Sequence, residues 1–286
     1  MNARKEWFFM LFTTLATLAG ISLLKGYWNT FRPELKEIDI HVLEPSYQGE
    51  LKILHLTDIH VEKLSVKPDK IKDLVGDQTF DLIALTGDYL DRVKSIDDFL
   101  AFLDGVVEIP NRLGIFAVWG NHDWVIKKEG LNLLQDEMEK RGVIVLSNES
   151  KTIQNQNQTI HIIGIDDHYS GHSDVVKAFQ HVPSYGTRII LTHDPLVTNQ
   201  MNYSFDYLLC GHFHSGQIYY PLPVHSLKMG LKPFKKYLSG IQHHTNGTYY
   251  ISGGLGQTGA NIRLGCRPEI TIHTLRAKKK KKEQVA

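Results

Sequence analysis

The sequence predicts an α/β domain with two packed sheets, preceded by a membrane-spanning segment. Short apolar runs alternate with helical stretches through most of the 286 residues, which is typical of parallel strands joined by helices. The last apolar runs follow one another without long helices between them, which favours a second sheet. An uncharged apolar run lies close to the N-terminus and has the length of a membrane helix.

The N-terminal run extends from Trp7 to Leu24 without a charged residue, and Arg4, Lys5 and Lys25 flank it. As a helix it would span roughly 27 Å, which is just enough to cross a bilayer core. A signal peptide is the alternative, but its apolar region is usually shorter and a small-residue cleavage site should follow it. We therefore expect an uncleaved anchor at residues 1–25. The flanking basic residues do not set its orientation, so the side of the membrane stays open.

The rest of the chain divides into three segments. We expect a linker with a first extended segment at residues 26–49, a globular domain at 50–276 and a Lys-rich tail at 277–286. Apolar runs predict strands at 51–56, 81–86, 115–119, 143–146, 160–165, 187–192 and 206–210. Helical spacing predicts helices near 68–77, 96–107, 129–141 and 173–181. A long loop from Ile218 to Gly247 with aromatic, Pro and Lys residues is a candidate membrane contact.

Composition excludes some function classes. The formal net charge of +1 provides no field that would attract nucleic acid, so no nucleic-acid partner is expected. The two cysteines, Cys210 and Cys266, show no CxxC spacing and indicate no disulfide framework. Histidine is abundant, with 15 residues, and only its placement can separate a metal site from solvated surface.

Five polar clusters stand where predicted strands end. Because ligands of open α/β sheets bind beyond the carboxyl ends of the strands, these clusters should meet at one edge. A single Asp or His at such a position often caps a helix or bonds a loop, but five in the same position indicate a functional site. The clusters are Asp58-Ile59-His60, Gly87-Asp88, Gly120-Asn121-His122-Asp123, Thr192-His193-Asp194 and Gly211-His212-Phe213-His214.

The residue types indicate a pair of metal ions. Carboxylate and imidazole ligands together suit Mn, Fe or Zn rather than Ca or Mg. Asp88 stands alone after its strand and is the candidate bridge, since its two oxygens could reach both ions. Two metals about 3.5–4 Å apart can clamp a phosphoester and supply a bridging hydroxide as nucleophile. His122 is the candidate acid for the leaving oxygen, with Asp123 expected to fix its tautomer.

The ordered set D-x-H, G-D, G-N-H-D, H and G-H-x-H resembles the calcineurin-like metallophosphoesterase family from about Leu51 to Leu275. The resemblance implies a four-layer αββα sandwich of two mixed sheets flanked by helices, and two divalent metal ions. It implies a first metal at Asp58, His60, Asp88 and His214. It implies a second metal at Asp88, Asn121, His193 and His212, with His122 as the catalytic residue that binds no metal.

The closing segment from Ser215 to Leu275 is similar to a bacterial, membrane-associated branch of that family. Some members of this branch cleave the pyrophosphate of a UDP-linked diacylated glucosamine. The resemblance therefore implies a phosphodiester or pyrophosphate substrate, with a lipid-linked or nucleotide-sugar compound as a candidate, at a bacterial cell membrane. The branch usually has Thr and Gly where this sequence has Phe213 and Ser215, which puts substrate access beside Phe213 in question.

Two other function classes remain as alternatives. Another metallohydrolase is one. A metallo-β-lactamase-like enzyme would have H-x-H-x-D-H, but His214 is followed by Ser-Gly-Gln, and an amidohydrolase would have H-x-H on an early strand, but here it is late. A catalytically inactive metal-binding module is the other, and the presence of all expected ligands and the candidate acid argues against it. The string from Gly254 to Gly259 fits GxGxxG, yet no βαβ unit follows, so a Gly-rich turn is expected there.

Overall fold

A computed structural model describes residues 3–43, 47–155, 158–218 and 238–277. Most of the candidate membrane-contacting loop from Ile218 to Gly247 lies outside the described residues. The same holds for nearly all of the Lys-rich tail at 277–286.

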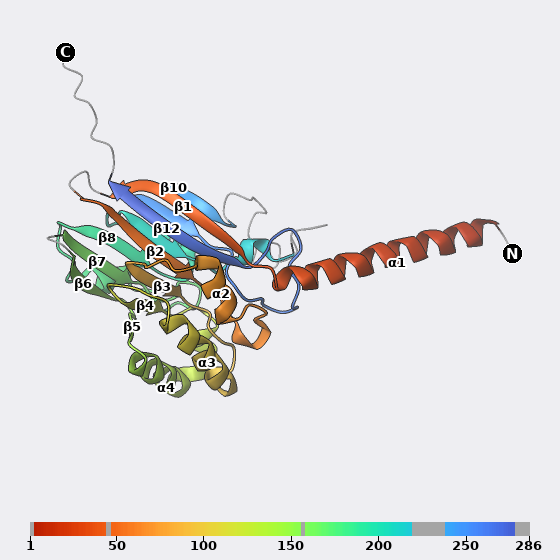
Figure 1. Cartoon of the computed structure of the whole chain (residues 1–286), viewed down its shortest axis with the longest axis horizontal. Helices are drawn as coiled ribbons and strands as arrows, with labels where there is room; N and C mark the ends of the chain where they lie inside the picture. Colours follow the sequence, from red (N-terminus) through yellow and green to blue (C-terminus); the bar gives the residue numbers. More distant parts are fainter. Residues whose placement is uncertain (1–2, 44–46, 156–157, 219–237, 278–286) are drawn as a thin grey trace, which may run out of the picture.

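Two mixed sheets form the centre of the domain, each with six strands among the described residues (Figure 1). The first has the order β1 (Glu34–Leu43), β12 (Glu269–Ala277), β2 (Glu50–Leu56), β3 (Leu82–Thr86), β4 (Ile115–Val118), β5 (Val143–Val145). The second has the order β10 (Gly240–His244), β11 (Gly247–Ile251), β9 (Tyr207–Cys210), β8 (Thr187–Leu191), β7 (Gln158–Gly164), β6 (Glu149–Asn155). The strands pair in parallel except for β12 with β2, β10 with β11 and β6 with β7. The seven strands predicted from apolar runs are thereby confirmed.

Strand β3 shows why the central strands are apolar at every position. Leu82 and Ala84 face the core between the sheets, whereas Ile83 and Leu85 face the helices. All of these side chains are fully buried. Burying one Leu or Ile contributes about 1.5–3 kcal/mol, so a strand covered on both faces gains from a continuous apolar run.

Helices cover the outer face of each sheet. The first sheet carries α2 (Pro68–Val75), α3 (Ile96–Val107) and α4 (Lys127–Lys140) (Figure 1). The second sheet carries α5 (Val175–Phe179). This arrangement of helices, two sheets and helices confirms the predicted α/β sandwich. Short 3₁₀ turns in the described residues are η1 (Val61–Lys63), η2 (Val93–Ser95), η3 (Asp123–Ile126), η4 (Pro195–Gln200) and η5 (His214–Gly216).

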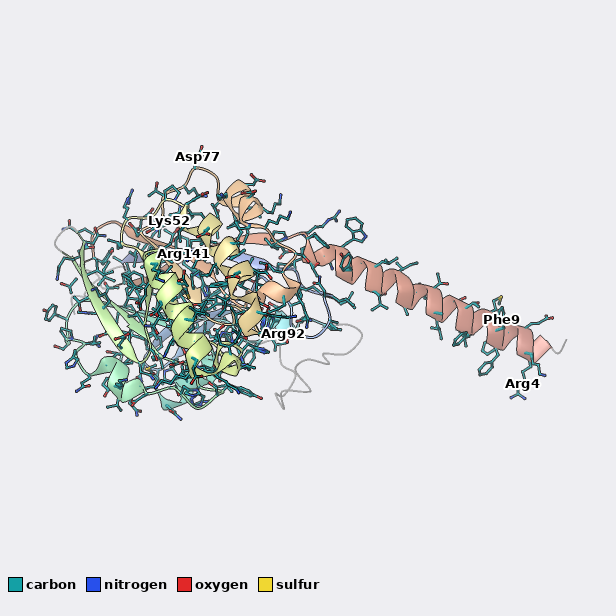
Figure 2. The ribbon with its side chains drawn as sticks, turned by 90° about the horizontal axis from the view of Figure 1, so that it is seen from below. Arg4, Phe9, Lys52, Asp77, Arg92 and Arg141 are labelled. Carbon is teal, nitrogen blue, oxygen red and sulfur yellow. The ribbon has the colours of Figure 1, made fainter. Side chains whose placement is uncertain are left out.

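Helix α1 (Ala3–Thr30) projects away from the sandwich, with Arg4 and Phe9 near its free end (Figures 1 and 2). Within the described residues, Arg4–Thr30 is the one helix long and apolar enough to cross a membrane, by length and composition. The expected division at residue 25 differs from the structure. Residues 26–30 continue the helix, and β1 begins at Glu34 as an edge strand parallel to β12.

The last turn of α1 is bonded to the domain. The Arg263 N–H donates to the Gly26 carbonyl oxygen over 2.9 Å, and the Asn29 side-chain amide donates to the Arg263 carbonyl oxygen over 2.9 Å. The hydroxyls of Thr30 and Ser65 lie 2.8 Å apart. The end of α1 is therefore part of the folded domain, where a linker was expected.

Candidate metal centre

The five polar clusters meet at one edge of the sandwich, because β2, β3, β4, β8 and β9 all end there. Loops of the two sheets are tied together at this edge: His193 Nδ1 lies 2.7 Å from the Thr86 carbonyl oxygen. The Asp58 N–H donates to the Gly87 carbonyl oxygen over 3.0 Å, which joins the loops after β2 and β3. Loops of both sheets therefore meet at this edge.

Five of the predicted ligands adopt left-handed backbone conformations, with φ between 41° and 76°. For residues other than glycine this conformation costs about 1–2 kcal/mol each, and it persists only where the surroundings fix it. The loop glycines supply that constraint. A Cβ at Gly87 would lie 2.4 Å from the Gly120 nitrogen, so two ligand loops pack backbone to backbone. The five residues are Asp58, His60, Asp88, His212 and His214.

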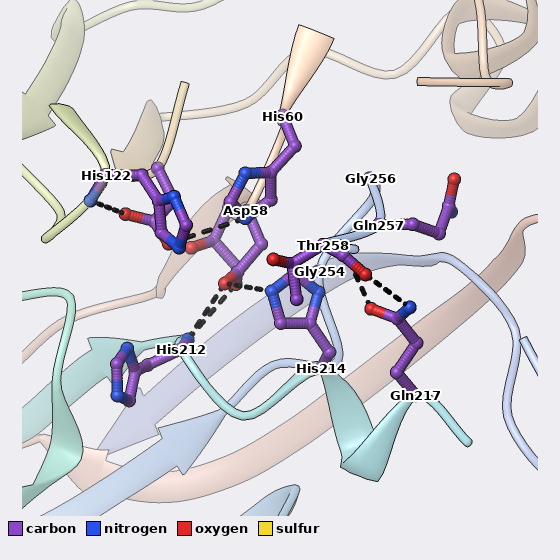
Figure 3. A network of polar contacts seen from close by, with 12 residues as sticks. Asp58, His60, His122, His212, His214, Gln217, Gly254, Gly256, Gln257 and Thr258 are labelled. Atoms are coloured by element: carbon purple, nitrogen blue, oxygen red, sulfur yellow. Dashed lines mark hydrogen bonds and ion pairs between the residues drawn. The ribbon is translucent and has the colours of Figure 1, made fainter. Parts of the chain in front are cut away.

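The side chains form two buried groups that could each hold a metal ion, and they share Asp88. Figure 3 shows Asp58, His60 and His214 of the first group and His212 of the second. Within each group, one candidate ligand atom per residue lies within 4.8 Å of the others. Asn121 adds a buried amide oxygen that has no hydrogen-bond partner among the described residues. The first group is Asp58, His60, Asp88 and His214, and the second is Asp88, His193 and His212.

Asp88 faces both groups with a single oxygen. Its Oδ2 lies 3.4 Å from His60 Nε2 and 3.1 Å from His193 Nε2. Its Oδ1 accepts the backbone N–H of His122 over 2.8 Å. Oδ2 is therefore the atom that lies between the two proposed positions, whereas Oδ1 is hydrogen-bonded to the chain itself.

The charges in the centre favour cations. Burial alone would lower the pKa of His60, but Asp88, Asp91 and Asp58 raise it to about 10. Burial likewise opposes charge on His193, and the carboxylates of Asp88 and Asp58 hold its pKa well above the ordinary value. Carboxylates that draw protons onto buried imidazoles create a negative potential that a divalent cation would satisfy.

His122 lies at the rim of the centre and pairs with a carboxylate absent from the sequence-based prediction. Its Nδ1 lies 2.8 Å from Asp91 Oδ1, and the same oxygen lies 3.1 Å from His60 Nδ1. The side chain of His122 is 30% exposed, so a substrate can reach it. Burial lowers the pKa of His122, but the hydrogen bond to Asp91 more than offsets this and raises it.

The profile of the calcineurin-like phosphoesterase family matches residues 51–216. The chain belongs to the calcineurin-like phosphoesterase family. Its match begins at β2 and ends within η5, so it spans all five polar clusters. This phosphoesterase is therefore a hydrolase of the metallophosphoesterase type, as the motif order implies.

Relatives along nearly the whole chain carry compatible names. The protein is 39% identical over 272 residues to the uncharacterized metallophosphoesterase YkoQ of Bacillus subtilis, covering 93% of this chain and 100% of YkoQ. It is 30% identical over 284 residues to phosphodiesterase YaeI of Escherichia coli, covering 95% of this chain and 98% of YaeI. A transmembrane protein with metallophosphoesterase domain from Bos taurus is 29% identical over 262 residues, covering 84% of this chain and 56% of that protein.

Asp123 has a different place in this phosphoesterase from the one expected. Its carboxylate is fully buried and accepts the backbone N–H groups of Asp88, Tyr89 and Gly120, each over 2.8 Å. The carboxylate of Asp123 therefore fixes the loops that carry Asp88 and Asn121. Asp91, and not Asp123, contacts the His122 ring. Burial, with the charge of Asp88, raises the pKa of Asp123 to about 7.

Phe213 also differs from expectation. It is 1% exposed and packs in the core beneath the second sheet with Cys210 and Ile251. The phenyl ring is therefore buried among core residues, with its centroid 5.2 Å from that of the His212 ring. The neighbouring Ser215 has φ 50°, a conformation that a glycine would adopt without strain.

Proposed function

We propose that this phosphoesterase hydrolyses a phosphodiester or pyrophosphate at a centre of two divalent cations. The first cation would be held by Asp58, His60, Asp88 and His214. The second would be held by Asp88, Asn121, His193 and His212. The observation that carries this proposal is the position of Asp88 Oδ2 between His60 Nε2 and His193 Nε2.

The donor set fits such cations. The two groups offer carboxylate oxygens and imidazole nitrogens, and the buried oxygen of Asn121 supplies a further donor. This mixture suits Mn, Fe or Zn. When bound, the two cations supply positive charge against the phosphoryl oxygens and lower the pKa of water in the centre.

The chain's own residues perform the remaining steps. His122, protonated at Nε2, would donate a proton to the leaving oxygen, and Asp91 would hold its Nδ1 proton so that Nε2 points outward. The raised pKa of His122 keeps this proton available near neutral pH. Asp123 would act through Asp88, by fixing the backbone that carries it.

A membrane-borne substrate is the finer part of the proposal, with a lipid-linked or nucleotide-sugar pyrophosphate as the candidate. Exposed aromatic side chains gather at the domain end of α1, namely Tyr27, Trp28 and Phe31. Aromatic residues at such a position are typical of a membrane–water interface. The same end of α1 is hydrogen-bonded to Arg263, whose side chain binds the loop beside Asp58 of the candidate metal centre. An anchor at α1 would therefore hold the centre near the membrane surface.

The experiment compares bis-p-nitrophenyl phosphate with p-nitrophenyl phosphate, using the full chain in detergent, stripped of metal and then supplied with Mn²⁺. Metal-dependent cleavage that favours the diester supports the proposal, and lipid-linked pyrophosphates would be assayed next. Failure to bind two equivalents of metal would contradict the ligand assignment. Equal rates on detergent-dispersed and freely soluble pyrophosphates would contradict the proposal of a membrane-borne substrate and leave the proposed hydrolysis itself intact.

A further inference from the structure

Arg263 is a buried arginine with no role in the proposed chemistry. Its side chain is fully buried, and it forms no salt bridge among the described residues. An unpaired buried cation is costly, so its hydrogen bonds must compensate. Nη1 donates to the carbonyl oxygens of Gly253 and Arg267, over 2.8 Å and 3.1 Å. Nη2 donates to the carbonyl oxygens of Gly254 and Gly256.

Three of the four carbonyls, those of Gly253, Gly254 and Gly256, belong to a loop that packs against Asp58. The Leu255 N–H donates to the Thr57 carbonyl oxygen over 3.0 Å, and the Gly256 N–H donates to the Asp58 carbonyl oxygen over 2.6 Å. Gly254 has φ +67°, and a Cβ there would lie 2.5 Å from Asp58 Cβ. Gly254 and Gly256 lie beside Asp58 in Figure 3. This loop therefore fixes the backbone of a proposed ligand from outside the polar clusters.

The backbone of Arg263 faces the other way, toward α1. Its N–H donates to the Gly26 carbonyl oxygen and its carbonyl oxygen accepts from the Asn29 side chain, both over 2.9 Å. A Cβ at Gly26 would lie 2.4 Å from Ile262 Cγ2, so the helix and this segment are in close contact. One residue thus joins the end of α1 to the loop on Asp58.

We propose that Arg263 is a positioning residue that couples α1 to the first metal position, through the Gly253–Gly256 loop and Asp58. This inference rests on the proposed assignment of Asp58, His60 and His214 as ligands of one cation. It predicts that the affinity for that cation depends on Arg263 and on the last turn of α1. Among the described residues, the loop reaches the second position only through Asp58, whose carboxylate accepts the His212 N–H over 3.1 Å, so the affinity of that position should fall less.

The test is Arg263→Lys, with Mn²⁺ titrated calorimetrically into the metal-free full chain in detergent. Lysine keeps the charge but lacks the planar fork that reaches four carbonyls. We expect the affinity of the first position to fall about 10–100-fold, as for residues that support metal ligands, and the other affinity to fall less. Arg188→Lys is the matched control, because Arg188 also donates to backbone carbonyls, those of Pro183 and Ser204, away from the centre.

Asn29→Ala tests the link between α1 and Arg263. If Arg263→Lys does not fold, this variant alone tests the coupling of α1 to the first metal position. It removes one hydrogen bond to Arg263 and should lower the affinity for the first cation by several fold, which corresponds to about one neutral hydrogen bond. Unchanged affinities in either folded variant would overturn the coupling, and so would an equal loss at both positions. If the wild type itself binds fewer than two equivalents, the proposed ligand assignment fails instead.

Discussion

Asp91 Oδ1 lies 2.8 Å from His122 Nδ1, so the candidate acid is oriented by a residue from the loop after β3. The ring of His122 follows β4, and its orienting carboxylate therefore comes from the neighbouring strand. Because the same oxygen also lies 3.1 Å from His60 Nδ1, Asp91 connects the proton donor with a proposed metal ligand.

His122→Ala should keep both metal ions and slow turnover. A positioned general acid contributes about 10²–10⁴-fold, and the loss should be largest for alkoxide leaving groups and smallest for p-nitrophenolate. The measurement is kcat for a series of diesters together with the metal content of each preparation. If the substitution empties the centre, His122 acts as a ligand and the assigned role is wrong.

Asp91→Asn should lower kcat about 10–100-fold, as is usual for partners that orient a ligand or a catalytic histidine. The effect should follow the leaving group in the same order as for His122→Ala. In the double variant the two losses should not add, because both act on one proton transfer. Asp97→Asn, on the exposed face of α3, makes the same chemical change and should leave kcat unaltered.

Asp88→Asn should remove both metal ions and all activity, because the shared oxygen loses its charge. Elemental analysis of the purified protein checks this, with circular dichroism to show that the fold is kept. Asp166→Asn is the control: Asp166 is 1% exposed and bonds Trp124 and Ser147 outside both metal groups. A variant at Asp88 that still held two ions would show that Asp88 is not the bridge.

His273→Asn should reduce the sensitivity of the fold to acid. Burial, with His55 nearby, holds the pKa of His273 well below its ordinary value, so the folded state stays neutral where the unfolded state gains a proton. Stability is therefore complete above about pH 6.5 and falls as the pH drops below it, by about 1.4 kcal/mol per pH unit for this one group.

Asn retains an acceptor near the Tyr207 hydroxyl, which lies 3.1 Å from His273 Nδ1. Denaturant unfolding of the metal-free protein between pH 7 and pH 5 gives the slope of unfolding free energy against pH for the wild type and for the variant. Equal slopes for wild type and variant would mean that His273 is protonated in the folded state.

Gly87→Ala should destabilise the domain far more than Gly142→Ala. Both glycines have left-handed φ values, +85° and +81°, so both substitutions carry about 1–2 kcal/mol of backbone strain. A Cβ at Gly87 meets the Gly120 backbone at 2.4 Å, whereas nothing lies within 4 Å of one at Gly142. Denaturant unfolding should show a further cost of about 1–3 kcal/mol at Gly87 from overpacking. Similar values for the two variants would show that the ligand loops can separate freely.

The sequence was sufficient for the parts of the centre that depend on strand order. Asp58, Asp88 and His193 each follow a buried run, and the carboxyl ends of parallel strands meet at one edge. Asp91 could not be found in this way, because it lies three residues beyond Asp88 and its partner is distant in sequence. A second carboxylate close after a ligand was the only available signal.

Side-chain direction was the other limit of the sequence. Asp123 adjoins His122 in the chain, yet its carboxylate turns to three backbone N–H groups. That direction depends on the η3 turn and on the loop after β3, neither of which has a periodic pattern. The continuation of α1 into the domain was missed for a similar reason, since its contacts are with residues near position 263.

Strand β12 lies between β1 and β2, and this order has a consequence for biosynthesis. Lys36 and Glu269 form an ion pair across β1 and β12 although they are 233 residues apart. During translation β1 and β2 are therefore made long before β12, the strand that pairs with both of them. The Gly253–Gly256 loop on Asp58 is also made late, because it lies between β11 and β12. A chain whose synthesis stops before β12 would therefore keep an open sheet edge on β1 and on β2.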